Sequence, residues 1–211
     1  MAPLHDVREL LFGDLPIRRW AGSGTGDPWV SFAHAVDLCE AGNSATARQQ
    51  YYSILAIPHL GTRHYLQAWE GLRALGEVPR PSVARHIYGV VLDVPMDESW
   101  DTLAAYADYS CRYLNHSGRA IIWDHPSDAL DPFVDRLLQA GRSLVSLIEP
   151  WPHPRPPLSP GMARISLLCP GGLHFGEGPL GTLLEDPTAA PVLEAGTALL
   201  RALVSFGGRD S

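Results

Sequence analysis

The spacing of apolar residues changes near residue 80, and this change divides the chain into two parts. Before it, apolar side chains recur every three or four residues, which is the spacing of an amphipathic helix. This pattern predicts a short helix over 4–12 and longer helices over 28–41, 45–56 and 62–76. After residue 80 apolar residues alternate with others, which is the spacing of a β-strand.

Short strands joined by tight turns dominate the start of the second part. The connections between the first four strands are too short to hold a helix, so neighbouring strands should run antiparallel as a meander. Two more strands are expected near the C-terminus. The predicted strands cover 86–94, 103–107, 110–114, 120–124, 163–169 and 173–175.

Two long helices complete the second part, predicted over 127–149 and 187–205 by apolar residues at i, i+3, i+4 and i+7. Between them, the prolines of 149–161 remove backbone donors and predict an extended, semi-rigid connection. The sequence therefore predicts an α+β fold, with a helical region over 1–80 and an antiparallel-sheet domain over 81–211. This layout resembles the profilin-like and roadblock scaffolds in its arrangement of elements.

The first two long helices carry small and aromatic residues at the spacing of a tetratricopeptide-type helical hairpin. The matching residues are Ala35, Leu38, Gly42, Ala47 and Tyr51. The resemblance covers about 28–56, and no second copy is visible, although arrays of such repeats normally need about three units. It implies a helical hairpin, either a true repeat or simply two antiparallel helices packed through small residues.

Composition excludes several classes of chemistry. The chain has no lysine, so a Schiff base, a Walker lysine and a lysine general base are all impossible. With a net charge of −7, nucleic acid is not an expected partner. The arginine-only basic residues, with abundant glycine, proline and alanine, favour a bacterial origin from a GC-rich genome.

The cysteines and the apolar segments give further expectations. The three cysteines, Cys39, Cys111 and Cys169, are far apart and form no C-x-x-C pair, so we expect neither a disulfide framework nor a zinc site. No cofactor is implied. The N-terminus does not look like a secretory signal, and no apolar run reaches 18 residues, so we expect a cytoplasmic protein that does not span a membrane.

The turns of the predicted meander hold most of the polar residues that could catalyse a reaction. They are Asp108, Asn115, His116, Ser117, Asp124 and His125. A histidine and a carboxylate near a serine could support acid–base or nucleophilic chemistry. However, Ser117 lies in an N-H-S-G turn rather than a nucleophile elbow, and these residue types also suit a hairpin turn for geometric reasons.

A second candidate is the glycine-rich segment 170–179. His174 and Glu177 are three residues apart, which would suit two metal ligands on a helix, but the glycines and prolines make a helix improbable there. No metal site is therefore predicted. A glycine-rich loop can let a ligand or a partner backbone approach closely, so Gly172, His174 and Phe175 are predicted to contact a partner or ligand.

Four aromatic residues on or beside the meander form the third candidate: Trp100, Tyr106, Tyr113 and Trp123. If several share one face of the sheet, they could line an apolar pocket or a protein-binding patch. The alternative is ordinary packing beneath the helix predicted over 127–149.

No catalytic signature stands out, so the leading hypothesis is a non-enzymatic interaction or regulatory subunit of a cytoplasmic complex. Its partner would be another protein or a second copy of the chain. One alternative is a small hydrolase that uses His116, Asp124, His174 and Glu177, which requires His116 and His174 to come together in space. Another alternative is a small-ligand sensor with a pocket between the sheet and the helix over 127–149.

Overall fold

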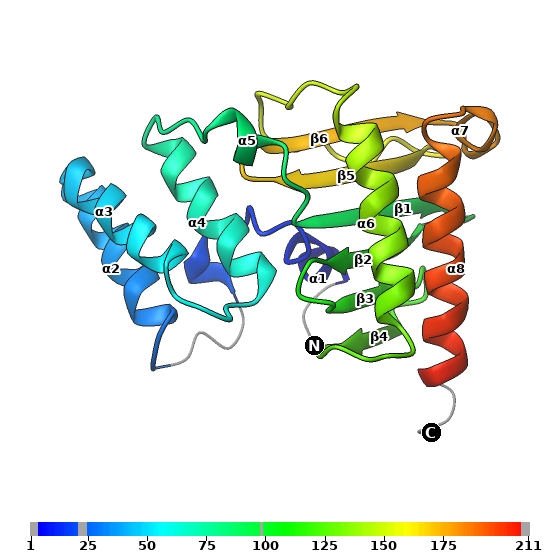
Figure 1. Cartoon of the computed structure of the whole chain (residues 1–211), viewed down its shortest axis with the longest axis horizontal. Coiled ribbons are helices and arrows are strands. Elements are labelled where there is room, and N and C mark those ends of the chain that lie inside the picture. Colours follow the sequence, from blue (N-terminus) through cyan, green and yellow to red (C-terminus); the bar gives the residue numbers. More distant parts are fainter. Residues whose placement is uncertain (1–3, 21–24, 98, 208–211) are drawn as a thin grey trace. The chain divides into compact units, whose positions relative to one another are not determined.

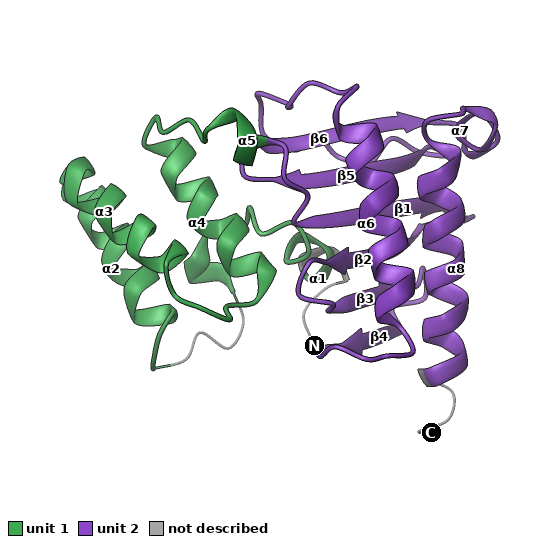
Figure 2. Ribbon diagram, viewed as in Figure 1, with its two compact units in different colours: residues 1–84 green, residues 85–211 purple. Residues whose placement is uncertain are grey.

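The computed structural model describes residues 4–20, 25–97 and 99–207. The chain separates into two compact units, residues 1–84 and 85–211 (Figure 2). The sequence places the boundary a few residues earlier, at the change of apolar spacing. The difference corresponds to a short helix, α5 (Pro81–Ala84), which belongs to the first unit.

The first unit is helical. Its three longer helices begin and end within two residues of their predicted bounds, whereas η1 and α5 are not predicted. The helices are α1 (Leu4–Glu9), η1 (Ile17–Arg19), α2 (Trp29–Glu40), α3 (Ser44–Leu55), α4 (Thr62–Ala74) and α5. Gly42 follows α2 and Gly76 follows α4, both with positive φ (75° and 83°), which is the conformation that glycine supplies at helix C-termini.

The core of the first unit combines aliphatic and aromatic side chains. Tyr51 of α3 packs against α4 at Gly71, where a Cβ atom would lie only 2.3 Å from the tyrosine ring. Gly71 lowers the helix propensity of α4, but because it has no side chain it allows α3 and α4 to pack closely. The His64 ring lies near Trp20 and Trp29, with centroids 5.5 and 5.1 Å away. The helices of the tetratricopeptide-like hairpin, α2 and α3, pack against each other, and Ala35 of α2 and Ala47 of α3 are both fully buried.

The second unit contains a six-stranded antiparallel sheet with strand order β4-β3-β2-β1-β5-β6 (Figure 1). The α+β fold and the antiparallel meander are thus as predicted. The strands are β1 (Gly89–Pro95), β2 (Trp100–Tyr106), β3 (Cys111–Leu114), β4 (Ala120–Trp123), β5 (Ala163–Cys169) and β6 (Gly172–Gly178). β6 is longer than predicted because its backbone pairs with β5 along its whole length, despite the glycines.

Two long helices, α6 (Asp131–Val145) and α8 (Ala190–Gly207), lie side by side over one face of this sheet (Figure 1). We call it the helix face. A mid-helix glycine lets α8 approach β1, because a Cβ atom at Gly196 would lie 2.1 Å from the Leu92 side chain. The short helix α7 (Leu180–Glu185) was not predicted, because the surrounding glycines and Pro179 indicate a loop.

Alternation along the strands assigns each residue to a face. The helix face carries the main apolar core, which includes Val90, Leu92, Leu103, Ala105, Cys111, Ile165 and Leu167. The opposite face carries buried polar residues, and Thr102, Asp93, Arg164 and Glu177 follow one another in register across β2, β1, β5 and β6. The Thr102 hydroxyl donates a 2.7 Å hydrogen bond to Asp93.

In the part of the chain that is described, no helix is long and apolar enough to cross a membrane.

Candidate interaction surface at the β6 edge

The segment that connects α6 to β5 wraps around the edge strand β6. We call residues 149–161 the proline strap. At its start, on the helix face, the buried His174 of β6 donates from Nδ1 to the Ile148 carbonyl over 2.7 Å. Arg85 donates to the Ser146 carbonyl over 3.0 Å and pairs with Glu149. Arg85 thus satisfies the carbonyl of the residue that caps the C-terminus of α6, and His174 satisfies a carbonyl just beyond it.

Trp151 then crosses the edge of β6. Its backbone N–H donates to the Leu173 carbonyl over 2.7 Å, so the strap makes a sheet-like contact with the edge strand. The indole meets the Phe175 ring edge-on at 5.3 Å, a favourable geometry for two aromatic rings. The indole N–H donates to the Pro154 carbonyl over 3.1 Å, which holds the side chain against its own strap. Trp151 nevertheless keeps 39% of its surface exposed.

Arg164 of β5 fastens the strap to the opposite face of the sheet. Its guanidinium donates to the carbonyls of Pro156 and Pro157, each over 2.7 Å, and pairs with Glu177 of β6. It also lies 4.9 Å from the centre of the Phe175 ring, within cation–π range. Arg164 is 2% exposed, so this is a buried charge whose donors are directed to defined acceptors.

Glu177 completes this fastening from β6. Burial acts to raise the pKa of its carboxyl group, but hydrogen bonds from Ser159 and Arg164 outweigh burial and lower that pKa below its ordinary value. The carboxylate therefore stays charged and bonded to both the strap and the strand. The strap is held at Trp151, at its central prolines and at Ser159, which makes its exposed surface rigid.

Two of the three residues predicted to bind a partner from the segment 170–179 belong to this surface. Phe175 supports Trp151, and Gly172, with a φ of 125°, lies beside Pro150. His174 instead points to the helix face, where burial lowers its pKa despite the hydrogen bond to Ile148. His174 and Glu177 lie on opposite faces of β6 and cannot share a metal ion. Trp151 was not among the predicted site residues, and the one available signal was a tryptophan within a proline-rich run.

The turn cluster of the meander is not gathered in one place. His116 in the β3–β4 turn bonds through Nδ1 to Asp101 over 2.9 Å, and the Tyr113 hydroxyl donates to the same carboxylate over 2.6 Å. Burial acts to raise the pKa of Asp101, but these bonds outweigh it and lower that pKa. Burial, followed by the bond to Asp101, raises the pKa of Tyr113 to about 12.

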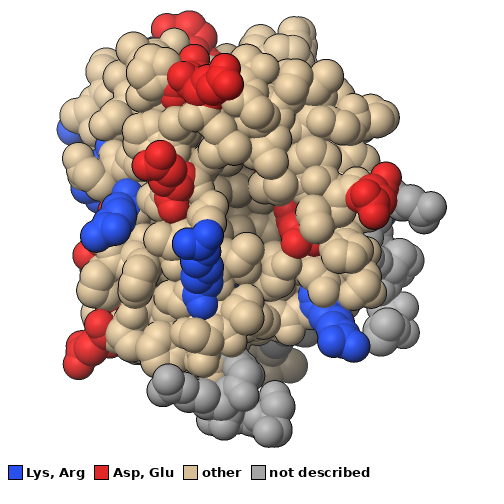
Figure 3. Space-filling view, turned by 90° about the vertical axis from the view of Figure 1, so that its right-hand side faces the viewer, with Lys and Arg blue, Asp and Glu red and all other residues tan. Residues whose placement is uncertain are grey.

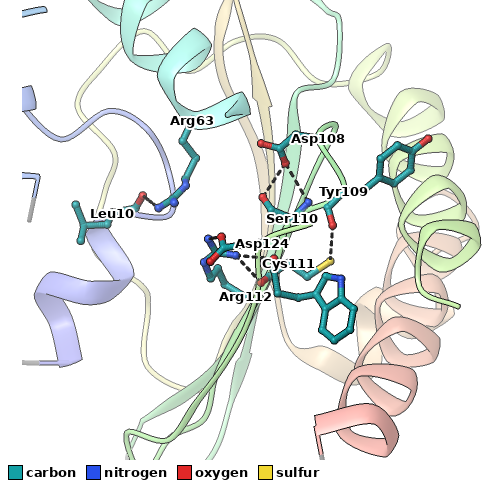
Figure 4. Close-up of polar contacts among 9 residues, drawn as sticks. Leu10, Arg63, Asp108, Tyr109, Ser110, Cys111, Arg112 and Asp124 are labelled. Atoms are coloured by element: carbon teal, nitrogen blue, oxygen red, sulfur yellow. Dashed lines mark hydrogen bonds and ion pairs between the residues drawn. The ribbon is translucent and has the colours of Figure 1, made fainter. Parts of the chain in front are cut away.

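Asp124 lies at the other end of β4 from His116, where it pairs with Arg112 (Figure 4). Arg112 also donates to the Trp123 carbonyl over 2.8 Å, so the pair ties β3 to β4. Asp108 caps the preceding turn, accepting from the Ser110 hydroxyl over 2.7 Å (Figure 4). Asp108 and Asp124 therefore each have a partner that belongs to the sheet or its turns.

His116 and His174 do not come together, which contradicts the geometry that the hydrolase hypothesis requires. His116 follows β3, and His174 lies on β6, with β2, β1 and β5 between them. Four inter-strand steps of about 4.8 Å give a separation of about 19 Å across the sheet. Sequence spacing could not reveal this, because it does not show that β5 and β6 add to the β1 side of the meander.

The four candidate aromatics also divide between the two faces. Tyr113 and Trp123 lie on the helix face and pack against its core, whereas Trp100 and Tyr106 lie on the opposite face. They therefore do not form one patch. Tyr106 is fully buried, and a Cβ atom at Gly89 on the neighbouring strand would lie 2.8 Å from its ring.

Metal-binding side chains and cysteine thiols are two further kinds of candidate site. Among the described residues, no three histidine, cysteine or acidic side chains are grouped as metal ligands. The three cysteines are free. Burial raises the pKa of the Cys111 thiol to about 12, which suppresses the reactive thiolate.

A groove of about 370 Å³ runs between α6 and α8. It is lined by Arg136, Gln139, Ala140, Ser143, Pro191, Glu194 and Ala195. It opens on the solvent side of the helices, whereas the ligand-sensor hypothesis expects a pocket between the sheet and α6. On the face shown in Figure 3, residues of both charges are scattered among uncharged ones.

No family model matches the chain, and neither a curated protein nor a solved structure matches it.

Proposed function

We propose that this protein is a non-enzymatic interaction or regulatory subunit that binds another protein through the β6 edge. The observation that carries the proposal is Trp151, an aromatic side chain held rigidly and left partly exposed among exposed prolines. Tryptophan is the residue type most enriched at the energetic centres of protein interfaces.

Rigidity supports the same proposal. Binding orders side chains and loops, and that ordering weakens the affinity. The proline strap is already held by Arg164 at Pro156 and Pro157 and by the bond from the Trp151 indole to Pro154. A partner that contacts it would therefore lose little conformational entropy on this side of the interface.

The hydrolase alternative retains one supporting contact, the bond between His116 and Asp101. A carboxylate that accepts from Nδ1 orients an imidazole as in catalytic dyads. In this turn, however, the same Asp101 oxygen also accepts the His116 backbone N–H over 2.8 Å. The contact therefore closes the β3–β4 turn, and we favour the interaction role.

The test is capture of a partner by the full-length protein from its native host, with light scattering to detect self-association. We expect one stoichiometric partner or a dimer. Trp151→Ala should reduce capture at least tenfold, whereas Val204→Ala, at an exposed apolar residue of α8, should not. Circular dichroism must show both variants folded. A monomer that captures nothing would contradict the proposal.

A further inference from the structure

From Pro154 to Pro160, exposure along the proline strap repeats every three residues. Pro154, Pro157 and Pro160 are exposed, and the residues between them are half-buried. Three residues is the period of the polyproline II helix, so residues at this spacing lie on one side of it. The segment between the bend at Pro154 and the turn at Pro160 thus has the exposure pattern expected of a polyproline II stretch that turns three proline rings to solvent.

The inward-facing side of the strap explains why this row keeps its orientation. Arg164 holds the carbonyls of Pro156 and Pro157, and Ser159 bonds to Glu177. These contacts lie at the half-buried positions or on the backbone. These hydrogen bonds use backbone carbonyls and the Ser159 side chain, so none of them involves an exposed proline ring.

We propose that the partner binds this row of proline rings in an aromatic-lined groove. The inference rests on the proposed interaction function and names the chemistry of its partner. Grooves lined with aromatic side chains recognise polyproline II segments with prolines three residues apart, because the rings stack and the ligand is already ordered. Successive exposed rings would be about 9 Å apart along the strap, so the groove needs aromatic pockets at that spacing.

The half-exposed Trp151 indole would lie at the N-terminal end of the bound segment. There it can extend the contact beyond the three rings, as an anchor outside the groove. The proline row and Trp151 thus make separable contributions, and substitution can distinguish them.

The experiment uses the full-length protein and the partner it captures, both purified. Isothermal titration should give a Kd for the wild type that rises at least tenfold, about 1.4 kcal/mol, in a Pro154→Ala/Pro157→Ala/Pro160→Ala variant. Pro156→Ala is the matched control, because it lies in the same strap but outside the exposed row, and should change Kd less than about twofold. Proteolysis at the strap must be unchanged in the triple variant.

A photo-crosslinking residue at Pro157 supplies the second readout, and we expect it to label a segment of the partner that contains aromatic side chains. An unchanged Kd in the triple variant would overturn the inference, as would labelling of a segment without aromatic residues. If Trp151→Ala still weakens capture in that case, the proposed function stands without this partner. Failure to capture any protein contradicts the proposed function itself.

Discussion

Strand β6 at one edge of the sheet has seven residues and is crossed by the proline strap, whereas β4 at the other edge has four residues and pairs within the sheet only with β3. Exposed edges offer unpaired backbone groups to other chains, and natural sheets keep such edges short or cover them. This chain uses both solutions, one at each edge. We infer that the longer edge strand, β6, depends on the proline strap to cover it, whereas the shorter edge strand, β4, needs no such cover.

The largest effect is expected from Arg164→Met. The change removes the donors to Pro156 and Pro157 and leaves the Glu177 carboxylate largely buried without its cation. Breaking such a pair costs about 3 kcal/mol of unfolding free energy, measured by urea denaturation. The strap should also become sensitive to protease.

The matched control for this change is Arg164→Met/Glu177→Gln. Because it removes both charges, it should recover part of the lost stability while leaving the strap released. Equal stability of the single and double variants would contradict the role assigned to the buried pair.

Phe175→Ala should have the next largest effect, because it removes the ring between Trp151 and Arg164. For a half-buried phenylalanine we expect a loss of about 2 kcal/mol, below the range for fully buried rings. Tryptophan fluorescence should shift to the red as Trp151 becomes more exposed. A stable variant with unchanged fluorescence would show that the ring does not support Trp151.

His174 predicts a pH dependence at the start of the strap. Burial lowers its pKa below the ordinary value of 6.5, so between the two pKa values the unfolded state binds more protons. Stability should therefore fall as the pH drops below about 7 and level off below the folded-state pKa. His174→Asn keeps a donor for Ile148 but cannot titrate. Denaturation from pH 7.5 to 5 should show a smaller loss in the variant, and identical curves would refute this.

The smallest effect is expected at the other edge. Ile122 of β4 is 59% exposed, and Ile122→Lys should change the free energy of unfolding by no more than about 0.5 kcal/mol. Thermal denaturation measures it. A loss of unfolding free energy comparable to that of Phe175→Ala would show that the short edge strand β4 also depends on covering side chains.

Much of the fold could be predicted because local signals agreed with tertiary packing. Strand β5 has its predicted bounds, since apolar and polar residues alternate from Ala163 to Leu167 and Pro170 follows its last residue. Strand β6 extends beyond its predicted bounds because pairing with β5 overrides the low strand propensity of its glycines. Helix α7 was missed for the related reason that Gly178, Pro179 and Gly181 indicate a loop.

The candidate site was harder to predict because it depends on sheet topology. The sequence shows that 149–161 is extended, but not that it wraps around an edge strand. The sequence predicts Phe175 as a site residue from its glycine-rich surroundings, whereas its contacts are with Trp151 and Arg164, which the sequence does not single out. The pairing of β5 with β6 and the path of the strap bring Phe175, Trp151 and Arg164 together. No local sequence pattern specifies this long-range arrangement.

The strap around β6 also limits how copies of this protein could stack. Growth of a sheet from molecule to molecule needs two open edges on every subunit, and here the segment from Trp151 to Ser159 obstructs one of them. Joining through β4 would use the same edge of both molecules and leave none for a third. Edge-to-edge association through β4 would then close as a two-fold pair instead of extending from molecule to molecule.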